Sequence, residues 1–351
     1  MTRYYMEQIE IKQLQPGEEA LWDAFIEQTS AEAMYHLTGW KRVIEQSFGH
    51  PTFYLYAAQA GRIVGVLPLV FLKSPMFGTY FVSIAFFNYG GILAADDAAR
   101  KRLLEEASAL ARIRGATHIE FRHQENYALG LPVKTSKVVM ILDLPESADA
   151  LWNSFKSKLR SQIRRPEKEG FTVKFGHLDL LDHYYDVFAV KMRELGTPVY
   201  AKRFFENILK AFPQQTHICV TYAQDRPIAA GFLVGFKDML QIPWASTLPE
   251  FDRFSPNMLL YWNILKFACD QGYQRFDFGR STPDEGTYRF KEQWGAKPVP
   301  CYWHYWLASG GDTLPELNPH NPKYEMAIKI WRRLPLAITK IIGPHVVKFL
   351  P

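Results

Sequence analysis

The order of predicted elements repeats once along the chain, and this repeat limits the fold more than any other feature. In the first half, a helix, a strand hairpin and a longer helix ending at Gly115 precede the strand IEFR. In the second half, a helix, a hairpin and a longer helix ending at Gly272 precede the strand FDFG, and the turn residue Gln59 corresponds to Gln224. We therefore expect two α/β units, each a mixed sheet flanked by helices. The alternative is that two ordinary α/β units have a similar order of elements by convergence.

The expected division places a first unit at 1–140, a second at 141–310 and a tail at 311–351. The seam lies near the strand Lys137–Leu144, which precedes a helix starting around Ala148. A chain of 351 residues has room for two domains that each bury a core.

Composition narrows the class of protein. The chain is 48% hydrophobic and 22% charged, as folded proteins are, and its net charge of +5 favours anionic ligands without requiring a nucleic acid. The three cysteines are far apart in sequence, so a zinc site and a disulfide framework are both poorly supported, and we expect no metal. The N-terminal residues contain no signal-peptide run, and no stretch approaches the roughly 20 apolar residues of a spanning helix. These features predict a cytoplasmic protein.

The stretch QRFDFGRSTPDEGTYRFKEQW, residues 274–294, has the sequence pattern of a site. It begins as a short strand, turns at Gly279 to Gly286, and continues as a helix that brings Tyr288, Lys291 and Trp294 near one another. Loops that follow rigid strands often carry chemistry. An ordinary strand-to-helix corner with a solvated lysine is the alternative.

A basic face is predicted on the helix LWNSFKSKLRSQIRR, residues 151–165, where Lys156, Arg160 and Arg164 recur every fourth residue. Like charges at this spacing repel by a few tenths of a kcal/mol, so a phosphate-bearing partner would stabilise them. A solvated basic face is the alternative.

Three further segments carry weaker signals. A turn at Gly196 and Pro198 exposes donors for an anionic group, and the strand Leu240–Ser246 ends in polar residues. Ser255 is expected to cap a helix whose first residue is Pro256. The residues singled out in the first two segments are Arg193, Tyr200, Arg203 and Trp244.

Motifs for a covalent nucleophile or a phosphate loop, such as GxSxG and GxxxxGK, do not occur in the sequence. A transferase that brings an amine to an activated carbonyl needs neither of them, because proximity, an acid or base, and a positive group near the oxyanion suffice.

The segments FNYGGI, SKLRSQIRRPEKEGF, RELGTPVY and FDFGRS…GTYRFKEQWGA together closely resemble the FemA/FemB-related transferases, in particular the branch associated with exosortase (PEP-CTERM) and exopolysaccharide gene clusters. The resemblance implies two tandem GNAT-type acyltransferase domains, with the active cleft in or beside the second. Family members transfer an aminoacyl group from charged tRNA to an amine of a peptidoglycan precursor, and relatives include acyl-CoA-dependent enzymes. The implied donor is therefore acyl-CoA or aminoacyl-tRNA, with no tightly bound cofactor.

The resemblance also implies site residues. Lys291 corresponds to a family lysine near the reacting groups, and Asp277, Arg280 and Tyr288 belong to the same signature. The expected catalytic residues are Lys291, Asp277 and Tyr288, and the expected substrate-binding residues are Arg160, Arg164, Arg193, Tyr200, Arg203, Trp244, Arg280, Asn88 and Tyr89.

Two departures from the family pattern bear on these expectations. The long helical hairpin of some members is missing, which weighs against a tRNA donor. Pro166 also interrupts the basic helix, so its last turn is expected to bend.

The leading functional hypothesis is transfer of an acyl or aminoacyl group to an amine of a peptidoglycan precursor or exopolysaccharide. The acceptor would be a small molecule or a lipid-linked glycan. One alternative is an acyl-CoA-dependent acetyltransferase acting on a sugar or nucleotide sugar. Another is a non-catalytic adaptor at the membrane surface in exopolysaccharide assembly.

Residues 321–351 lie outside the repeat and contain six Lys or Arg against one Glu. Their pattern predicts two short amphipathic helices separated near Pro335. Basic amphipathic helices bind anionic membrane surfaces, which would place the protein in peripheral contact with the inner membrane. Packing of the tail over the domain interface explains the apolar residues equally well.

Overall fold

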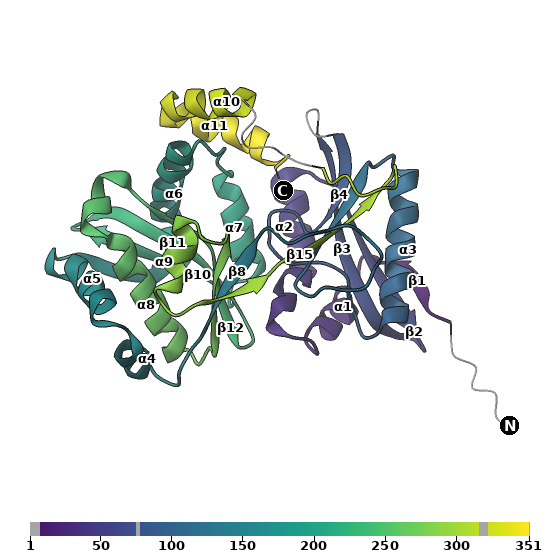
Figure 1. Ribbon diagram of the computed structural model, residues 1–351, viewed down its shortest axis with the longest axis horizontal. Coiled ribbons are helices and arrows are strands. Elements are labelled where there is room, and N and C mark those ends of the chain that lie inside the picture. The colour runs from purple at the N-terminus through teal and green to yellow at the C-terminus, as the bar shows by residue number, and fades with distance from the viewer. Residues whose placement is uncertain (1–7, 75–77, 316–321, 351) are drawn as a thin grey trace. The chain divides into compact units, whose positions relative to one another are not determined.

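A computed structural model of the chain describes residues 8–74, 78–315 and 322–350. It contains two compact units, each described below by itself (Figure 1). The first unit combines the chain up to Ser136 with Pro300–Pro315, and the second combines Lys137–Val299 with the C-terminal helices. Within the part of the chain that the structure describes, no helix has the length and apolar character needed to cross a membrane.

The first unit is built on a sheet in the order β1-β2-β3-β4-β6-β15-β7, with β5 paired to β3. Helix α3 packs on β2 and β3, and the core beneath it includes Leu67, Phe81 and Phe121. The elements are β1 (Glu10–Gln13), α1 (Glu19–Ile26), a 3-10 helix (Ala31–His36), α2 (Gly39–Phe48), β2 (Thr52–Gln59), β3 (Arg62–Ser74), β4 (Gly78–Ser83), β5 (Leu93–Ala94), α3 (Asp97–Ile113), β6 (His118–His123), β7 (Val133–Lys134) and β15 (Tyr302–Leu307).

The second unit is built on a sheet in the order β14-β8-β13-β12-β11-β10-β9. Its elements are β8 (Val138–Asp143), α4 (Ala148–Ser154), α5 (Ser157–Lys168), β9 (Thr172–Gly176), a 3-10 helix (Leu178–Leu180), α6 (Leu181–Leu195), α7 (Lys202–Ala211), β10 (Thr216–Ala223), β11 (Arg226–Phe236), β12 (Met239–Thr247), a 3-10 helix (Pro249–Phe254), α8 (Pro256–Asp270), β13 (Arg275–Ser281), α9 (Gly286–Glu292), β14 (Lys297–Pro300), α10 (Pro322–Arg333) and α11 (Leu336–Val347).

The two sheets share one topology, which confirms the predicted pair of mixed α/β units. In each sheet a strand that precedes the long helix pairs in parallel with the strand after it, β4 with β6 and β12 with β13. The strand beyond is antiparallel in both cases, β15 next to β6 and β8 next to β13. The equivalent strands therefore occupy equivalent positions in the two units.

The position of β15 differs from the division expected from sequence, which placed residues up to 310 in the second unit. This strand pairs with β6 from Tyr302 opposite His123 to Leu307 opposite His118, so it completes the first sheet. The chain thus returns to the first unit after β14. Such a return depends on pairing between segments far apart in sequence, which a local pattern does not encode.

Side chains alternate between the two faces of the second sheet, as the strand period requires. Gly231 and Ala245 face helix α8, whereas their neighbours Phe232 and Trp244 face α6 and α7. The α8 face buries a core that includes residues from α4 and α5. The opposite face buries a cluster of aromatic rings that includes Phe205.

The predicted continuous helix 151–165 is wrong, because the chain forms two helices there. Phe155 (ψ 142°) and Lys156 (ψ 148°) have extended backbones that separate α4 from α5. The break lets the Phe155 ring pack edge-on against Trp262 and Trp294, with centroid distances of 5.8 and 5.5 Å. Pro166 does not end α5, which continues to Lys168.

The expected capping role of Ser255 is wrong, and the apolar stretch around 81–92 forms a strand only as far as Ser83. The Ser255 side chain makes no capping hydrogen bond, because this residue has a left-handed backbone (φ 56°) and accepts from Met258 through its carbonyl. The apolar stretch around 81–92 is not one strand. Strand β4 ends at Ser83, and Ile84 and Phe86 have positive φ angles of 48° and 77°.

The tail forms the two predicted helices, and both pack on α6 of the second unit (Figure 1). Lys340 of α11 pairs with Asp186 of α6 at 2.9 Å. A Cβ added to Gly343 would lie 2.8 Å from the backbone nitrogen of Val199, so α11 lies close to the backbone there. The structure therefore supports a packing role for one side of the tail.

Candidate active site

Lys291 is the central residue of the candidate site. It projects from α9 and its side chain is only 7% exposed. Its ammonium donates hydrogen bonds to the carbonyl oxygens of Gly279 and Arg280, each at 2.9 Å. An ammonium has three N–H donors, so these two bonds leave one donor for a further group.

Gly279 and Asp277 shape the strand that Lys291 contacts. Gly279 has a left-handed backbone (φ 79°), and its N–H donates to the Asp277 carboxylate at 2.7 Å. At this point the pairing of β13 with β8 shifts in register, between Asp277 and Arg280. At this irregularity the carbonyl oxygens of Gly279 and Arg280 accept hydrogen bonds from the buried ammonium.

The pKa of Lys291 is lowered from 10.5 to about 8, because burial disfavours its charged form. The Asp277 carboxylate opposes this shift, while the Arg280 guanidinium adds to it. The ammonium therefore stays mostly charged at pH 7, close to its titration point. Buried ionisable groups with a shifted pKa of this kind are characteristic of functional sites.

The candidate site lies where two parallel strands part. Strands β12 and β13 pair only from Met239 opposite Arg275 to Gln241 opposite Asp277. Beyond that point β12 continues to Thr247 and β13 to Ser281 without pairing to each other. A second register shift, in the pairing of β12 with β11, falls at the same level. Unpaired strand edges present backbone N–H and C=O groups that can bind an extended ligand.

Aromatic packing holds α9 against the strand. Tyr261 of α8 stacks on Phe278 of β13 at a centroid distance of 5.5 Å and contacts Phe290 of α9 at 5.1 Å. Tyr288 is half-buried against the same core, and Arg280 is exposed. The structure thus brings Asp277, Arg280 and Lys291 together, with Tyr288 on the first turn of the same helix as Lys291.

A second group of predicted residues lies on the α6 and α7 face of the sheet. Tyr200 contacts Trp244 edge-on at a centroid distance of 6.1 Å. Arg193 lies in the last turn of α6 and is half-buried, and Arg203 is exposed on α7. Tyr200 and Trp244 therefore belong to the aromatic cluster of this face, with the two arginines on its helices.

The basic helix residues form a third group. Arg160 is half-buried and Arg164 is exposed on α5. The Arg164 guanidinium lies 5.3 Å from the centre of the Trp152 ring, so α4 supplies a cation–π partner for it. No single cluster gathers Arg160 and Arg164 with Lys291 in the contacts that the structure records for them.

Asn88 and Tyr89 belong to the first unit and lie in the turn after β4, not at a strand end. Tyr89 is 2% exposed and packs beside Tyr35 at a centroid distance of 6.2 Å. The adjacent glycines have a packing role, because a Cβ on Gly91 would lie 2.2 Å from the His123 ring. The FNYGGI motif thus builds the core of the first unit.

Two buried hydroxyls near the strand ends were not among the predicted site residues, although Ser246 ends a strand that the sequence analysis singled out. Ser246 of β12 and Ser281 of β13 are each 4% exposed, and neither Oγ has a hydrogen-bond partner among the residues that the structure describes. Buried polar groups without partners are uncommon in folded proteins, so each is available to a bound ligand or water. The only signal for Ser281 was its place in the FDFGRS motif.

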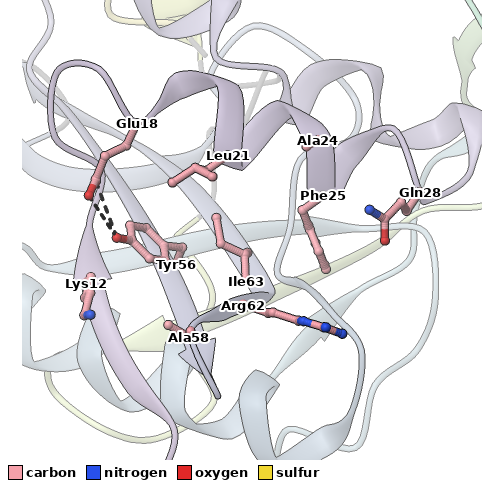
Figure 2. Close-up of a pocket in the computed structure, with 11 residues that line it drawn as sticks. Lys12, Glu18, Leu21, Ala24, Phe25, Gln28, Tyr56, Ala58, Arg62 and Ile63 are labelled. Carbon is pink, nitrogen blue, oxygen red and sulfur yellow. Dashed lines mark hydrogen bonds between the residues drawn. The ribbon is translucent and has the colours of Figure 1, made fainter.

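Two pockets are lined by none of the predicted catalytic or substrate-binding residues. One of about 780 Å³ in the second unit is lined by Phe155, Leu159 and Trp294, with Lys156 and Lys158 also on its lining. One of about 420 Å³ in the first unit lies between α1 and the β2–β3 hairpin (Figure 2). There the Tyr56 hydroxyl donates to the Glu18 carboxylate at 3.3 Å.

Neither metal binding nor disulfide formation is indicated in the described ranges. Residues 8–74, 78–315 and 322–350 contain no group of three or more His, Cys, Asp or Glu side chains placed to hold a metal ion. Cys219, Cys269 and Cys301 are buried and free.

Comparison with known proteins defines the class of the second unit. Residues 153–292 match the family model of an acetyltransferase (GNAT) domain, and this range contains Lys291 and the parting strands. The second unit is therefore similar to GNAT acetyltransferase domains over most of its length. No curated protein sequence matches the chain.

Solved structures extend the comparison to both units. The crystal structure of FemX is similar at a TM-score of 0.63 and 17% identity, covering 84% of this chain and 96% of that one. A tandem GNAT protein from the clavulanic acid biosynthesis pathway is similar at a TM-score of 0.55 and 12% identity, covering 87% and 100%. The C-terminal domain of a putative lysylphosphatidylglycerol synthetase from Agrobacterium fabrum is similar at a TM-score of 0.56 and 14% identity, covering 83% of this chain and 91% of that one. These identities are low, so they show the fold alone, which is that of tandem GNAT domains.

Proposed function

We propose that the chain is a FemA/FemB-related N-acyltransferase that moves an acyl or aminoacyl group to an amine of a peptidoglycan precursor or exopolysaccharide. The observation that carries the proposal is the buried Lys291 ammonium, held by the Gly279 and Arg280 carbonyls of β13 at the level where β12 and β13 part. A similarity in fold to FemX and to a tandem GNAT protein adds support.

The reaction joins the amine nitrogen to the carbonyl carbon of the donor. The new C–N bond forms, the donor's C–S or C–O bond breaks, the amine loses a proton, and the leaving sulfur or oxygen gains one. Negative charge develops on the carbonyl oxygen in the tetrahedral intermediate. A preorganised positive group near that oxygen lowers the barrier more than any other single device.

We assign the positive group to Lys291. Its ammonium is fixed by two backbone carbonyls and retains one donor, so it needs no reorganisation when charge develops. Asp277 fixes the Gly279 turn that presents those carbonyls and favours the charged lysine. The half-buried Tyr288 hydroxyl on the same helix is the proposed proton donor to the leaving group.

For substrate binding we propose the arginines and aromatics of the second unit. Arg280 and the α5 residues Arg160 and Arg164 are suited to phosphates of a donor or of a nucleotide-linked acceptor, because guanidinium groups bind phosphate with two parallel hydrogen bonds. The acceptor is proposed to bind at Tyr200 and Trp244, with Arg193 and Arg203 on the adjacent helices. The roles of Asn88 and Tyr89 in the first unit stay a prediction.

Both proposed donors, acyl-CoA and aminoacyl-tRNA, are made in the cytoplasm, so we propose that the reaction occurs there, with no tightly bound cofactor. The parted strand edges favour acyl-CoA as the first donor to test, because an extended chain with amide groups can pair with such edges.

The test is a transfer assay on the purified chain with amino-sugar and peptidoglycan-precursor acceptors. Acyl-CoA turnover is followed by release of free thiol, aminoacyl-tRNA turnover by loss of the charged tRNA, and the product by mass spectrometry. We expect product from one donor and loss of product in Lys291→Met, by at least about a hundredfold, as for removal of an oxyanion-stabilising donor.

Lys266→Met is the matched control, because Lys266 is exposed on α8 of the same unit. It should turn over like the parent chain. If neither donor is consumed and neither shifts the melting temperature, the enzyme proposal is wrong and the adaptor alternative replaces it. Unchanged turnover in Lys291→Met would remove that residue from the mechanism while leaving the proposed reaction in place.

A further inference from the structure

Exposed apolar side chains concentrate on the two C-terminal helices. Eleven large hydrophobic side chains are exposed among the described residues, and five of them belong to α10 and α11. On α10 they are Met326 and Ile330, and on α11 they are Ile338, Ile341 and Ile342. Residues three or four apart lie on one face of a helix, so each helix carries an apolar stripe. A concentration of this kind marks an interaction surface.

The packed side of α11 fixes the direction of its stripe. Thr339, Gly343 and Val347, spaced four apart, are the buried residues of this helix. Gly343 lies against the backbone of Val199, and Lys340 pairs with Asp186 of α6. Ile341 is 69% exposed. The apolar stripe of α11 therefore faces away from the body of the second unit.

Helix α10 is attached in the same way. Its Ile328 side chain lies so close to Gly196, the residue after α6, that an added Cβ there would be 2.5 Å away. Arg332 donates to the backbone carbonyl of Leu195 at 3.3 Å. Met326 and Ile330 are 58% and 57% exposed. The Leu195 side chain is itself 47% exposed and continues the apolar area next to α10.

The surroundings of the apolar stripes are basic. Lys329, Arg332 and Arg333 are exposed on α10, Lys348 follows α11, and Glu325 is the only acid on the two helices. Apolar residues flanked by Lys and Arg match the acyl and headgroup layers of an anionic bilayer. A second copy of the same surface would instead bring like charges together across a two-fold axis, which opposes pairing.

Helix length determines the mode of contact. Each helix has 12 residues and is therefore about 18 Å long, short of the roughly 30 Å hydrocarbon core. The two helices can lie in the interface but cannot span it.

We propose that α10 and α11 form a docking surface for an anionic phospholipid bilayer. The apolar stripes of Met326, Ile330, Ile338, Ile341 and Ile342 enter the headgroup and acyl boundary, and the flanking cations bind the lipid phosphates. The proposal rests on this surface alone and is independent of the acyl-transfer proposal. It deepens the expected peripheral location by assigning it to one face of two helices.

The test is sedimentation of the full chain with vesicles of phosphatidylglycerol and phosphatidylcholine, and with vesicles of phosphatidylcholine alone. We expect binding to the anionic vesicles, weakening as salt is raised, and little binding to the neutral ones. The triple variant Ile338→Ser, Ile341→Ser and Ile342→Ser should weaken binding at least about tenfold, because it removes most of the α11 stripe. These side chains are exposed, so the melting temperature should stay close to that of the parent chain.

Two matched controls separate the surface from general effects. Ile113→Ser changes an 81% exposed isoleucine on α3 and should bind like the parent chain. The pair Lys329→Gln and Arg333→Gln should weaken binding about fivefold per charge removed, whereas Lys101→Gln, at an exposed position on α3, should not.

Three results would overturn the proposal. The full chain could fail to sediment with anionic vesicles, or Ile113→Ser could lose as much binding as the triple variant. The third is a dimer in solution that the triple variant converts to a monomer, which would assign the surface to a second copy of the chain.

Discussion

The ammonium of Lys291 donates a 2.9 Å hydrogen bond to the carbonyl oxygen of Gly279, a glycine with a φ of 79°. One buried cation thereby fixes a left-handed turn in the middle of β13. The same contact places the lysine on the part of β13 that lies beyond its pairing with β12. Support of the strand and the proposed stabilisation of developing charge would thus belong to one side chain, and the two roles need separate measurements.

The pH dependence of transfer tests the charge on Lys291. Its pKa is about 8, so the ammonium loses its proton as the pH rises through that value. If the cation stabilises the oxyanion, the rate at saturating donor should fall by about tenfold for each pH unit above 8. Lys291→Arg keeps its charge at all these pH values, so any activity that it retains should not fall above pH 8 in this way. A rate that rises through pH 8 would assign the residue as a base instead.

Folding stability tests the same pKa without a substrate. The unfolded lysine titrates near 10.5 and the folded one near 8, so between these values the unfolded state binds more protons. Stability should therefore rise with pH across this window, by up to about 3 kcal/mol from this group. Urea unfolding at pH 7.5 and pH 10 measures the rise, and Lys291→Met should show less of it than Lys266→Met. Equal rises in the two variants would contradict the buried position of the ammonium.

Gly279→Ala tests the turn that Lys291 supports. A Cβ at this position would lie 3.6 Å from the Ile242 carbonyl, which is an ordinary contact, so space is available. The left-handed backbone at this position should lower the free energy of unfolding by roughly 1–2 kcal/mol when the residue has a Cβ. We expect a loss of that size in urea unfolding together with reduced transfer.

Gly286→Ala is the control for that substitution. It also lies in the loop-to-helix segment, has nothing within 4 Å of an added Cβ, and begins α9. Alanine should be neutral or slightly stabilising there, because it favours helix by up to about 1 kcal/mol. If both variants lose the same stability, strain at Gly279 is not the cause.

The sequence predicted the elements well but not the contacts that create the site. Local pattern predicted the helix that ends at Gly115 and the hairpin that turns at Gln224, which the structure shows as α3 and as β10 with β11. The break between α4 and α5 depends on Phe155 packing against Trp262 and Trp294, which are distant in sequence. Local patterns carry no information about such packing.

The partners of Lys291 illustrate the same limit. The FKEQW motif identified this lysine, but its partners are backbone carbonyls, exposed only because Gly279 adopts a left-handed turn. No residue type signals a carbonyl as a partner. The strand β15 was assigned to the wrong unit for a similar reason, since His304 meets His123 across 181 positions of sequence.

The buried histidines of the first unit predict acid sensitivity. The Ile92 N–H donates to His123 Nε2 at 2.9 Å, so the His123 proton is on Nδ1 and is donated to His304 Nδ1 at 2.9 Å. His304 then donates from Nε2 to the Tyr127 carbonyl at 3.1 Å. Both rings are neutral in this chain of bonds, and burial lowers the pKa of each.

The pKa of His36 sets the expected size of the stability loss in acid. Burial lowers its pKa from 6.5 to about 4, so below pH 6.5 the unfolded state binds the proton first. Stability should be complete above pH 6.5 and decrease as the pH falls toward 4, by up to about 3 kcal/mol from His36. Urea unfolding between pH 7 and pH 4.5 measures the decrease. His36→Gln retains a donor for the Gly91 carbonyl but cannot titrate, so it should lose less stability in acid, whereas exposed His345→Gln should behave like the parent chain.

Gly343→Ala separates helix propensity from packing on the tail. Propensity alone predicts that alanine stabilises α11 by up to about 1 kcal/mol. The added Cβ, however, would lie 2.8 Å from the backbone nitrogen of Val199 and 3.0 Å from its carbonyl oxygen. Backbone atoms cannot move aside as a flexible side chain does, so α11 must shift away from the segment after α6. We expect faster proteolysis of the C-terminal helices and weaker anchoring of the tail. Gly286→Ala, which has open space, controls for the added methyl group, and a tail as resistant as that of the parent chain would show that α11 is not held at Val199.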